Sequence, residues 1–451
     1  MKTRIFAALL AALFCACCFA PMSVFAEAAE ESTKSLPEGL TIACVGDSIT
    51  YGSGSAATDA NPTSVVKDDT KNYPAVLANL IGGEPTITGG GNGTTNVVFK
   101  NDKVTIYNDG KASTAVLNDS FAGDEFKNGA LYVPTLMNSF ERNDLDIVVL
   151  MLGTNDSKIT DYRYDKADKK YEMGNWDPTS STHDRSLGDI LDENGNVVVR
   201  PTPAQEFELR YRAILDKYFN MESAPYVYCM LPIPCASEGY EEDKDYSKSY
   251  RISDKNMREE INPLITSIVE DLQAEGKPVG LIDMRSAFPD PTEDGVEELC
   301  KYLVDEVHPN PAGYEIMANT VYERLLADTH QVSYVVEDGD EGAVAPKPSL
   351  VFGDKEIVVK NTGGRLTKNG VANVGWSTEP NGEGTVYEEG AKISFKSGDS
   401  DITLYPVWGN AGSAGVGGGD STTLIIAIVG GIAVIGLFAA GFVVLKKNKK
   451  A

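Results

Sequence analysis

Histidine is scarce in this chain: 451 residues contain three of them. An imidazole exchanges a proton readily near neutral pH, so few side chains here qualify as a general base. Cysteine is sparse too, since only four of the seven lie outside the N-terminal apolar stretch. No two of those four have the spacing of metal ligands, and together with the few histidines this argues against a structural zinc site.

Positive charge is also in deficit. Forty Lys and Arg stand against 66 Asp and Glu, and the formal net charge is −26. A surface this acidic repels nucleic acid and anionic membrane surfaces. We therefore expect no nucleic-acid partner, and neutral glycans match the charge better than polyanions do.

Both ends of the chain are predicted to lie outside the folded core. Residues 1–26 begin with basic residues, continue with an apolar stretch and end in Val24-Phe25-Ala26, the pattern of a secretory signal. Residues 424–445 carry no charge and would span about 33 Å as a helix, enough for a bilayer core. The lysine-rich residues 446–451 then mark the cytoplasmic side. We expect an exported bacterial protein on the cell surface, anchored by one C-terminal transmembrane helix with its N-terminus outside.

Strand and helix signals alternate five times between residues 40 and 330, which predicts an α/β fold: a three-layer sandwich with a parallel sheet. Within it, residues 97–121 are interpreted as a hairpin insertion and residues 157–200 as a long loop over the site. Residues 349–409, with short alternating runs broken by glycine, predict a small β-rich module. The remaining segments are a polar leader at 27–39, a linker at 331–348 and a Gly/Ser linker at 410–423.

Side chains that suit catalysis follow the predicted strands. Ser48 comes just after the apolar run that ends at Gly46, and Asn155 follows the strongest strand signal, at residues 145–152. Open α/β folds place their chemistry at the carboxyl ends of such strands, so we expect the two side chains at one sheet edge.

One histidine fits the same edge. His183 lies in an irregular polar loop and His330 ends the last helix of the domain, which leaves His308 as the general base. Asp305, three residues earlier, can hold the other ring nitrogen of His308 if the two share one turn.

Four short blocks occur in this order: Gly46-Asp47-Ser48-Ile49-Thr50, Gly91-x-Gly93, Gly153-Thr154-Asn155-Asp156 and Asp305-x-x-His308-Pro309. Together they are similar to the four blocks of the SGNH (GDSL-type) hydrolases, and the resemblance covers about residues 40–328. It implies a flavodoxin-like α/β/α sandwich and an enzyme that needs no metal or organic cofactor. The glycine block departs from the family, which usually carries asparagine before its first glycine.

The resemblance also implies roles for these residues. Ser48 would be the nucleophile, His308 its general base, and Asp305 the group that orients the imidazole and stabilises its charge. The oxyanion hole would use the main-chain N–H of Ser48, the main-chain N–H of Gly93 and the side-chain amide of Asn155.

The sequence around the blocks narrows the implied activity. Gly153–Lys158, the loop Asn175-Trp176 and the stretch Tyr228–Pro234 resemble SGNH esterases of the carbohydrate or sialate O-acetylesterase type. The implied reaction is ester hydrolysis, with an O-acetyl group on a glycan as the expected substrate. Lys158 and Trp176 line the pocket in this interpretation; otherwise they are a solvated lysine and a packed aromatic.

Two other functions stay open. The first is a lipase or lysophospholipase, which a preference for long acyl chains would reveal. The second is an adhesin whose hydrolase domain binds glycans without turnover. Asp47 and Asp156, which flank the expected catalytic residues, are interpreted as hydrogen-bonding supports rather than as catalytic groups.

The β-rich module resembles a second family. Val374–Thr378, Asn381–Tyr387 and Thr403–Trp408 are similar to the Listeria–Bacteroides (internalin B-type) repeats of bacterial surface proteins. These repeats are small β-grasp-like units that serve as spacers or adhesion modules. The single copy here favours a spacer.

The four cysteines outside the leader divide into two pairs. Cys44 and Cys229 lie in apolar runs and are expected to be buried. Cys235 and Cys300 lie in segments that could both approach the active edge, so a disulfide and two free thiols both stay open.

Overall fold

The computed structural model describes residues 34–89, 96–117, 134–157, 163–165, 170–172, 190–191, 197–199, 203–237, 252–336 and 343–409. The predicted secretory signal (1–26) and transmembrane helix (424–445) lie outside these ranges. Among the helices within them, none is long and apolar enough to cross a bilayer. The anchor therefore stays a prediction.

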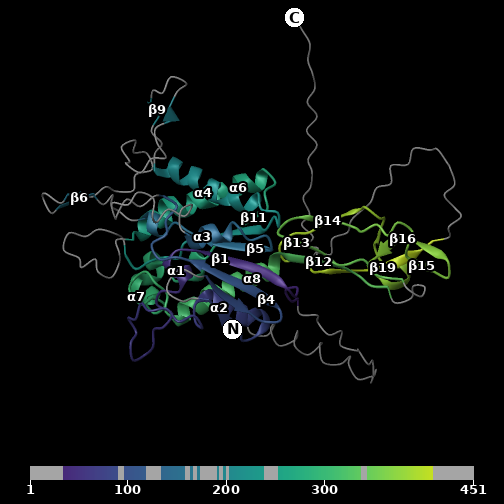
Figure 1. Ribbon diagram of the computed structural model, residues 1–451, viewed down its shortest axis with the longest axis horizontal. Coiled ribbons are helices and arrows are strands. Elements are labelled where there is room, and N and C mark those ends of the chain that lie inside the picture. The colour runs from purple at the N-terminus through teal and green to yellow at the C-terminus, as the bar shows by residue number, and fades with distance from the viewer. Residues whose placement is uncertain are drawn as a thin grey trace, which may run out of the picture.

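One seven-stranded sheet forms the middle of the α/β domain, in the order β11-β10-β5-β1-β4-β3-β2 (Figure 1). The first five strands in this order run parallel, and β3 and β2 add an antiparallel edge. The bounds are β1 Leu40–Gly46, β2 Thr86–Thr88, β3 Val97–Lys100, β4 Val104–Gly110, β5 Ile147–Met151, β10 Tyr226–Met230 and β11 Val279–Ile282. Every residue of β5 and β10 is buried, as continuous apolar runs in the centre of a parallel sheet should be.

Helices cover both faces of this sheet. Successive strand side chains point to opposite faces, so Ile42 of β1 packs with α2 and α8, whereas Val45 packs with α4 and α6. In Figure 1, α4 and α6 accordingly lie on one side of the sheet and α2 and α8 on the other. The predicted three-layer α/β arrangement is confirmed. The helices are α1 Ser48–Tyr51, α2 Tyr73–Gly82, α3 Pro134–Ser139, α4 Pro203–Phe219, α5 Asp254–Asn256, α6 Asn262–Ala274, α7 Val296–Cys300 and α8 Pro311–Asp328.

The hairpin predicted within residues 97–121 is confirmed for the described residues, because β3 pairs antiparallel with β4, but its interpretation as an insertion is wrong. β4 pairs in parallel with β1 over its whole length, from Leu40 opposite Val104 to Gly46 opposite Gly110. The alternating pattern of β4 arises because every second side chain of its first half is only partly buried. β4 is therefore both the second strand of the hairpin and a parallel strand of the main sheet.

The region predicted as a loop, residues 157–200, contains two short strand pairs in its described parts. β6 Arg163–Asp165 pairs with β7 Lys170–Glu172, and β8 Ile190–Leu191 pairs with β9 Val197–Val199, both antiparallel. The helix expected near Ser253 begins there: the Ser253 hydroxyl oxygen accepts a hydrogen bond from the Asn256 N–H (3.2 Å). The predicted kink at Pro263 takes the form of a π-helical turn, η2 Met257–Ile261, because a proline ring displaces the carbonyl four residues earlier.

A second sheet follows α8 without a break. β12 Thr329–Tyr334 pairs with β13 and β19 in the order β13-β12-β19-β16-β15, and Trp376 lies in its core. The predicted β-rich module is confirmed, and the predicted domain boundary at 330/331 falls inside β12. The other strands are β13 Ser349–Phe352, β14 Glu356–Val358, β15 Thr367–Lys368, β16 Val371–Ser377, β17 Val386–Tyr387, β18 Lys392–Ser394 and β19 Ile402–Trp408. The remaining turns are η1 Asn155–Ser157, η3 Arg285–Ala287, η4 Pro291–Gly295 and η5 Pro380–Gly382.

The β module packs against the end of the first sheet that lies away from Ser48. The ring centroid of Phe352 lies 6.3 Å from that of Tyr226, the first residue of β10. The Gly398 N–H donates to the Ala327 carbonyl near the end of α8 (2.9 Å). Since β10 and β1 run in the same direction, these contacts are at the amino ends of the strands.

Candidate active site

The turn from β1 into α1 presents Ser48. Asp47 caps the helix, and its carboxylate accepts a hydrogen bond from the Ile49 N–H (2.9 Å). A Cβ at Gly46 would lie 2.6 Å from the Met151 carbonyl oxygen and would overlap the Thr50 hydroxyl. Only glycine therefore fits where the chain turns from β1 into α1, because the end of the neighbouring strand β5 lies so close. The predicted supporting role of Asp47 is confirmed.

His308 contacts Ser48 directly. Its Nε2 lies 2.8 Å from the Ser48 Oγ, and its Nδ1 lies 2.7 Å from the Asp305 Oδ2. A carboxylate can only accept, so Nδ1 carries the ring proton and Nε2 accepts from the serine hydroxyl. Asp305 and His308 are 8% and 7% exposed, which keeps this chain of bonds largely out of bulk water.

The loop that carries His308 is held in one conformation. The other Asp305 oxygen accepts from the main-chain N–H groups of His308 (2.8 Å) and Val307 (3.2 Å). Glu306, the residue after Asp305, adopts φ +70°, a left-handed conformation that is rare for a residue with a side chain. The Asp305 carboxylate thus shapes the loop and contacts the imidazole at once.

Asn155 lies at the carboxyl end of β5, in η1. Its side-chain amide donates to the Thr114 carbonyl (3.0 Å), and a primary amide has a second N–H to offer. Next to it, the Asp156 carboxylate accepts from the main-chain N–H groups of Val116 (3.0 Å) and Leu117 (2.7 Å). The supporting role predicted for Asp156 is confirmed: it joins the end of β5 to the segment after β4.

Four residues singled out in the sequence lie outside the described residues: Gly93, Lys158, Trp176 and His183. His330 is described and is buried at the joint with the β module, where it stacks on Phe395 (ring centroids 4.9 Å apart). Of the described histidines, His308 alone contacts Ser48, as its position in the sequence suggested.

None of the cysteines within the described residues forms a disulfide. Cys44 and Cys229 are buried as predicted, and burial raises the pKa of Cys229 to about 12. A disulfide between Cys235 and Cys300 is not formed. Cys235 is buried with its Sγ 3.3 Å from the Ser237 carbonyl oxygen, whereas Cys300 is exposed at the end of α7.

The end of β4 contributes to the site and was not predicted from the sequence. A Cβ at Gly110 would overlap the main-chain nitrogen of Tyr51, so α1 packs directly on this strand. The preceding Asp109 is buried and binds Arg142 and Asn96. Burial raises the pKa of Asp109, and both partners act against that rise. Because Asn108-Asp109-Gly110 has the composition of a turn, the sequence alone did not reveal this buried strand end.

The chain is similar to several known proteins. The family model "GDSL-like Lipase/Acylhydrolase" matches residues 42–321. A protein from Evansella cellulosilytica described as "Putative membrane protein" is 30% identical over 124 residues, 27% of this chain, and the match spans 18% of that relative. Among solved structures, an aryl esterase of M. smegmatis is 15% identical, and the match covers 63% of this chain and 97% of that one with a TM-score of 0.36. A carbohydrate acetylesterase from Sinorhizobium meliloti is 14% identical, with 64% of this chain and 99% of that one covered and a TM-score of 0.38. An acetylxylan esterase from Geobacillus stearothermophilus is 16% identical, with 64% of this chain and 94% of that one covered and a TM-score of 0.32.

Proposed function

The chain belongs to the GDSL-like lipase/acylhydrolase family, and from this premise we propose that it is a serine esterase with Ser48 as its nucleophile. The observation that carries the proposal is the chain of bonds from Ser48 Oγ through His308 to Asp305, with distances of 2.8 and 2.7 Å. A serine hydroxyl next to a neutral imidazole that a carboxylate orients is the arrangement that activates an oxygen nucleophile.

The reaction proceeds in two halves. His308 Nε2 takes the Ser48 proton as Oγ attacks the ester carbonyl, and the resulting imidazolium donates that proton to the departing alcohol. The acyl group is then bonded to Ser48 Oγ. A water molecule, deprotonated by the same imidazole, attacks this ester, releases the acid and returns the proton to Ser48. Asp305 stays ionised and stabilises the imidazolium in both halves.

The oxyanion of each tetrahedral intermediate needs donors at the same edge. The main-chain N–H of Ser48 stands at the first position of α1, where a helix leaves its N–H groups without helical partners. The second N–H of the Asn155 amide is the other donor, and the family resemblance adds the main-chain N–H of Gly93. Each preorganised donor is typically worth about 3 kcal/mol in the transition state.

The substrate we propose is an O-acetyl ester on a carbohydrate. The sequence context of Asn155 and the stretch Tyr228–Pro234 support it through their resemblance to carbohydrate O-acetylesterases. The net charge of −26 supports it too, because an acidic protein approaches neutral glycans more readily than anionic lipid surfaces. In this proposal Lys158 and Trp176 line the glycan pocket, and no cofactor takes part.

The cellular setting is proposed from the sequence. The leader at 1–26 exports the protein, the helix at 424–445 anchors it to the cell membrane, and the β module spaces the esterase from the membrane surface. The resemblance of residues 349–409 to internalin B-type repeats supports this spacer role.

The family name covers lipases as well as other acylhydrolases, and this keeps a lipase as the second candidate. Acetate release from acetylated xylan, acetylated sialoglycan and O-acetylated peptidoglycan tests the first candidate, with Ser48→Ala as the control. A parallel series of p-nitrophenyl esters from acetate to palmitate distinguishes the two. We expect acetate release from one glycan and a rate that falls with chain length; rates that rise toward palmitate would favour a lipase, and glycan binding without acetate release an adhesin.

A further inference from the structure

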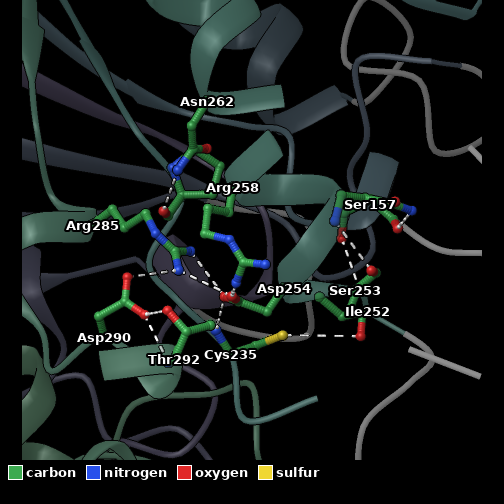
Figure 2. Close-up of polar contacts among 12 residues, drawn as sticks. Ser157, Cys235, Ile252, Ser253, Asp254, Arg258, Asn262, Arg285, Asp290 and Thr292 are labelled. Carbon is green, nitrogen blue, oxygen red and sulfur yellow. Dashed lines mark hydrogen bonds and ion pairs between the residues drawn. The ribbon is translucent and has the colours of Figure 1, made fainter. Parts of the chain in front are cut away.

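A buried carboxylate lies beside the candidate site and takes no part in the proposed reaction. Asp254, 1% exposed, accepts hydrogen bonds from both terminal nitrogens of Arg285 (2.8 and 3.0 Å) and from Arg258 (3.1 Å). Its Oδ1 also accepts from the main-chain N–H of Cys235 (3.0 Å). Figure 2 shows both guanidinium groups pointing at this one carboxylate, with the Cys235 nitrogen approaching it as well.

From Asp254 a short series of contacts leads to His308. The next residue after Cys235, Ala236, donates its N–H to the Glu306 carbonyl (2.8 Å), and Glu306 is the residue with φ +70° between Asp305 and His308. Cys235 also shares a small apolar cluster with Val307, completed by Ile252 and Met257. The Cys235-Ala236 segment, which Asp254 binds, thus supports the His308 loop through one hydrogen bond and one packing contact.

A second series of contacts leads from the same segment to Asn155. The Ser253 N–H donates to the Ser157 hydroxyl (3.3 Å), and the Asn256 side chain donates to the Ser157 carbonyl (2.9 Å). Ser157 closes the turn η1, which Asn155 opens. Both bonds flank Asp254 in sequence, so the residues on either side of this carboxylate hold the turn that carries Asn155.

The carboxylate itself is fixed from the far side. Arg285 follows β11 and also binds Asp290 (3.4 Å), whose carboxylate caps η4 by accepting from the Thr292 N–H (2.8 Å). Asp254 therefore cannot shift without breaking a bidentate pair whose cation is held by a second carboxylate. A planar fork of this kind fixes orientation as well as distance.

We propose that Asp254, held by Arg285, is a positioning residue that sets both His308 and Asn155 against Ser48. This inference rests on the proposed esterase function, and it adds a residue that touches neither substrate nor the reacting atoms. Displacements of about 1 Å at reacting groups can cost about a hundredfold in rate, and both the base and an oxyanion donor depend on this one carboxylate.

The test compares the full-length wild type with Asp254→Asn and with the milder Arg285→Lys, which keeps the charge and loses the fork. The substrate is p-nitrophenyl acetate, and active sites are titrated with a fluorophosphonate that labels the nucleophilic serine. We expect kcat per labelled site to fall ten- to a hundredfold in Asp254→Asn and less in Arg285→Lys, with KM changed less than threefold. The double variant should lose no more than Asp254→Asn alone, because both changes break one interaction.

The matched control is Asp328→Asn, which also alters a buried carboxylate paired with an arginine on its own helix, Arg324, at the joint with the β module. A merely structural role for Asp254 would lower the labelled fraction and leave kcat per labelled site unchanged. The proposal is overturned if Asp254→Asn keeps the kcat per site of Asp328→Asn, or, where Asp254→Asn does not fold, if Arg285→Lys keeps the wild-type value. If instead Ser48→Ala hydrolyses the ester as fast as the wild type, the esterase function itself fails.

Discussion

His308 Nε2 lies 2.8 Å from Ser48 Oγ, although 260 residues separate the two in the chain. Ser48 opens α1 at the end of β1, and His308 ends the loop that leads into α8. A contact between these helices maintains the distance: the Tyr314 hydroxyl of α8 lies 3.0 Å from the carbonyl oxygen of Ile49, inside α1, and 2.8 Å from that of Ser53, just after α1.

The first prediction concerns the carboxylate behind the base. Asp305→Asn removes the acceptor that keeps the proton on His308 Nδ1, so the imidazole loses its orienting partner and its counter-charge. We expect kcat for p-nitrophenyl acetate to fall roughly a thousandfold or more, as in other Ser-His-Asp sites. A fall of less than threefold, in a variant whose thermal midpoint shows it to be folded, would remove Asp305 from the mechanism.

The second prediction concerns the contact between α8 and α1. Tyr314→Phe leaves the Ile49 and Ser53 carbonyls without their phenol donor, which should cost about 1–3 kcal/mol of unfolding free energy. The turn that carries Ser48 should also loosen, and kcat should fall severalfold. Urea denaturation and steady-state kinetics measure the two effects. Tyr322→Phe, on the same helix but only partly buried, is the control and should change neither quantity.

The third prediction concerns the tight turn at Gly46. In Gly46→Ala the new methyl group would collide with the Met151 carbonyl and with Thr50, so either β1 or α1 must move. Overpacking of this kind costs about 1–3 kcal/mol, and here it would also displace Ser48. Adding Thr50→Ala should restore only part of the stability, since Met151 contributes main-chain atoms. Unchanged melting and activity in Gly46→Ala would show that the turn has room that the structure lacks.

The fourth prediction concerns pH and the joint between the domains. Burial lowers the pKa of His330, and the charge of Lys34 acts in the same direction, whereas Asp328 and Asp399 oppose it. The folded state therefore binds the proton more weakly than the unfolded state, whose histidine titrates near 6.5. Stability should be at its full value above pH 6.5 and should fall as the pH drops below it.

The measurement for this is the urea midpoint between pH 5 and pH 7.5. In His330→Phe the share of the decline that comes from His330 should vanish, because a phenyl ring keeps the stack on Phe395 and takes up no proton. A decline of equal size in wild type and His330→Phe would assign the pH dependence to other groups.

The sequence was sufficient for β1 and β5, the strands that precede Ser48 and Asn155, and for the association of Ser48 with His308 and Asp305. Strands such as β5 are continuous apolar runs, and continuous runs are what a doubly covered sheet requires. The scarcity of histidine was equally useful, because with three candidates the position of His308 after the last strand decided the choice of base.

What the sequence could not supply are relationships between distant segments. The sequence indicated β4 as a hairpin strand, and it does pair with β3, but only its pairing with β1 shows that it belongs to the parallel sheet. The Tyr314 hydroxyl binds a main-chain carbonyl of α1, and the Asp254 carboxylate binds Arg285, which is 31 residues away in the chain. No local sequence pattern marks partners of either kind. The question of a disulfide could not be decided from the sequence for the same reason: Cys235 packs in an apolar cluster with Ile252, Met257 and Val307 and is not bonded to Cys300.

The central claim is that Ser48 is the nucleophile of an ester hydrolase, and its most direct test is the rate of p-nitrophenyl acetate hydrolysis by wild type and by Ser48→Ala under the same conditions. Because the serine oxygen forms the acyl bond, its removal should lower kcat by at least about a thousandfold while leaving the fold intact by circular dichroism. Equal rates in the two proteins would contradict the account.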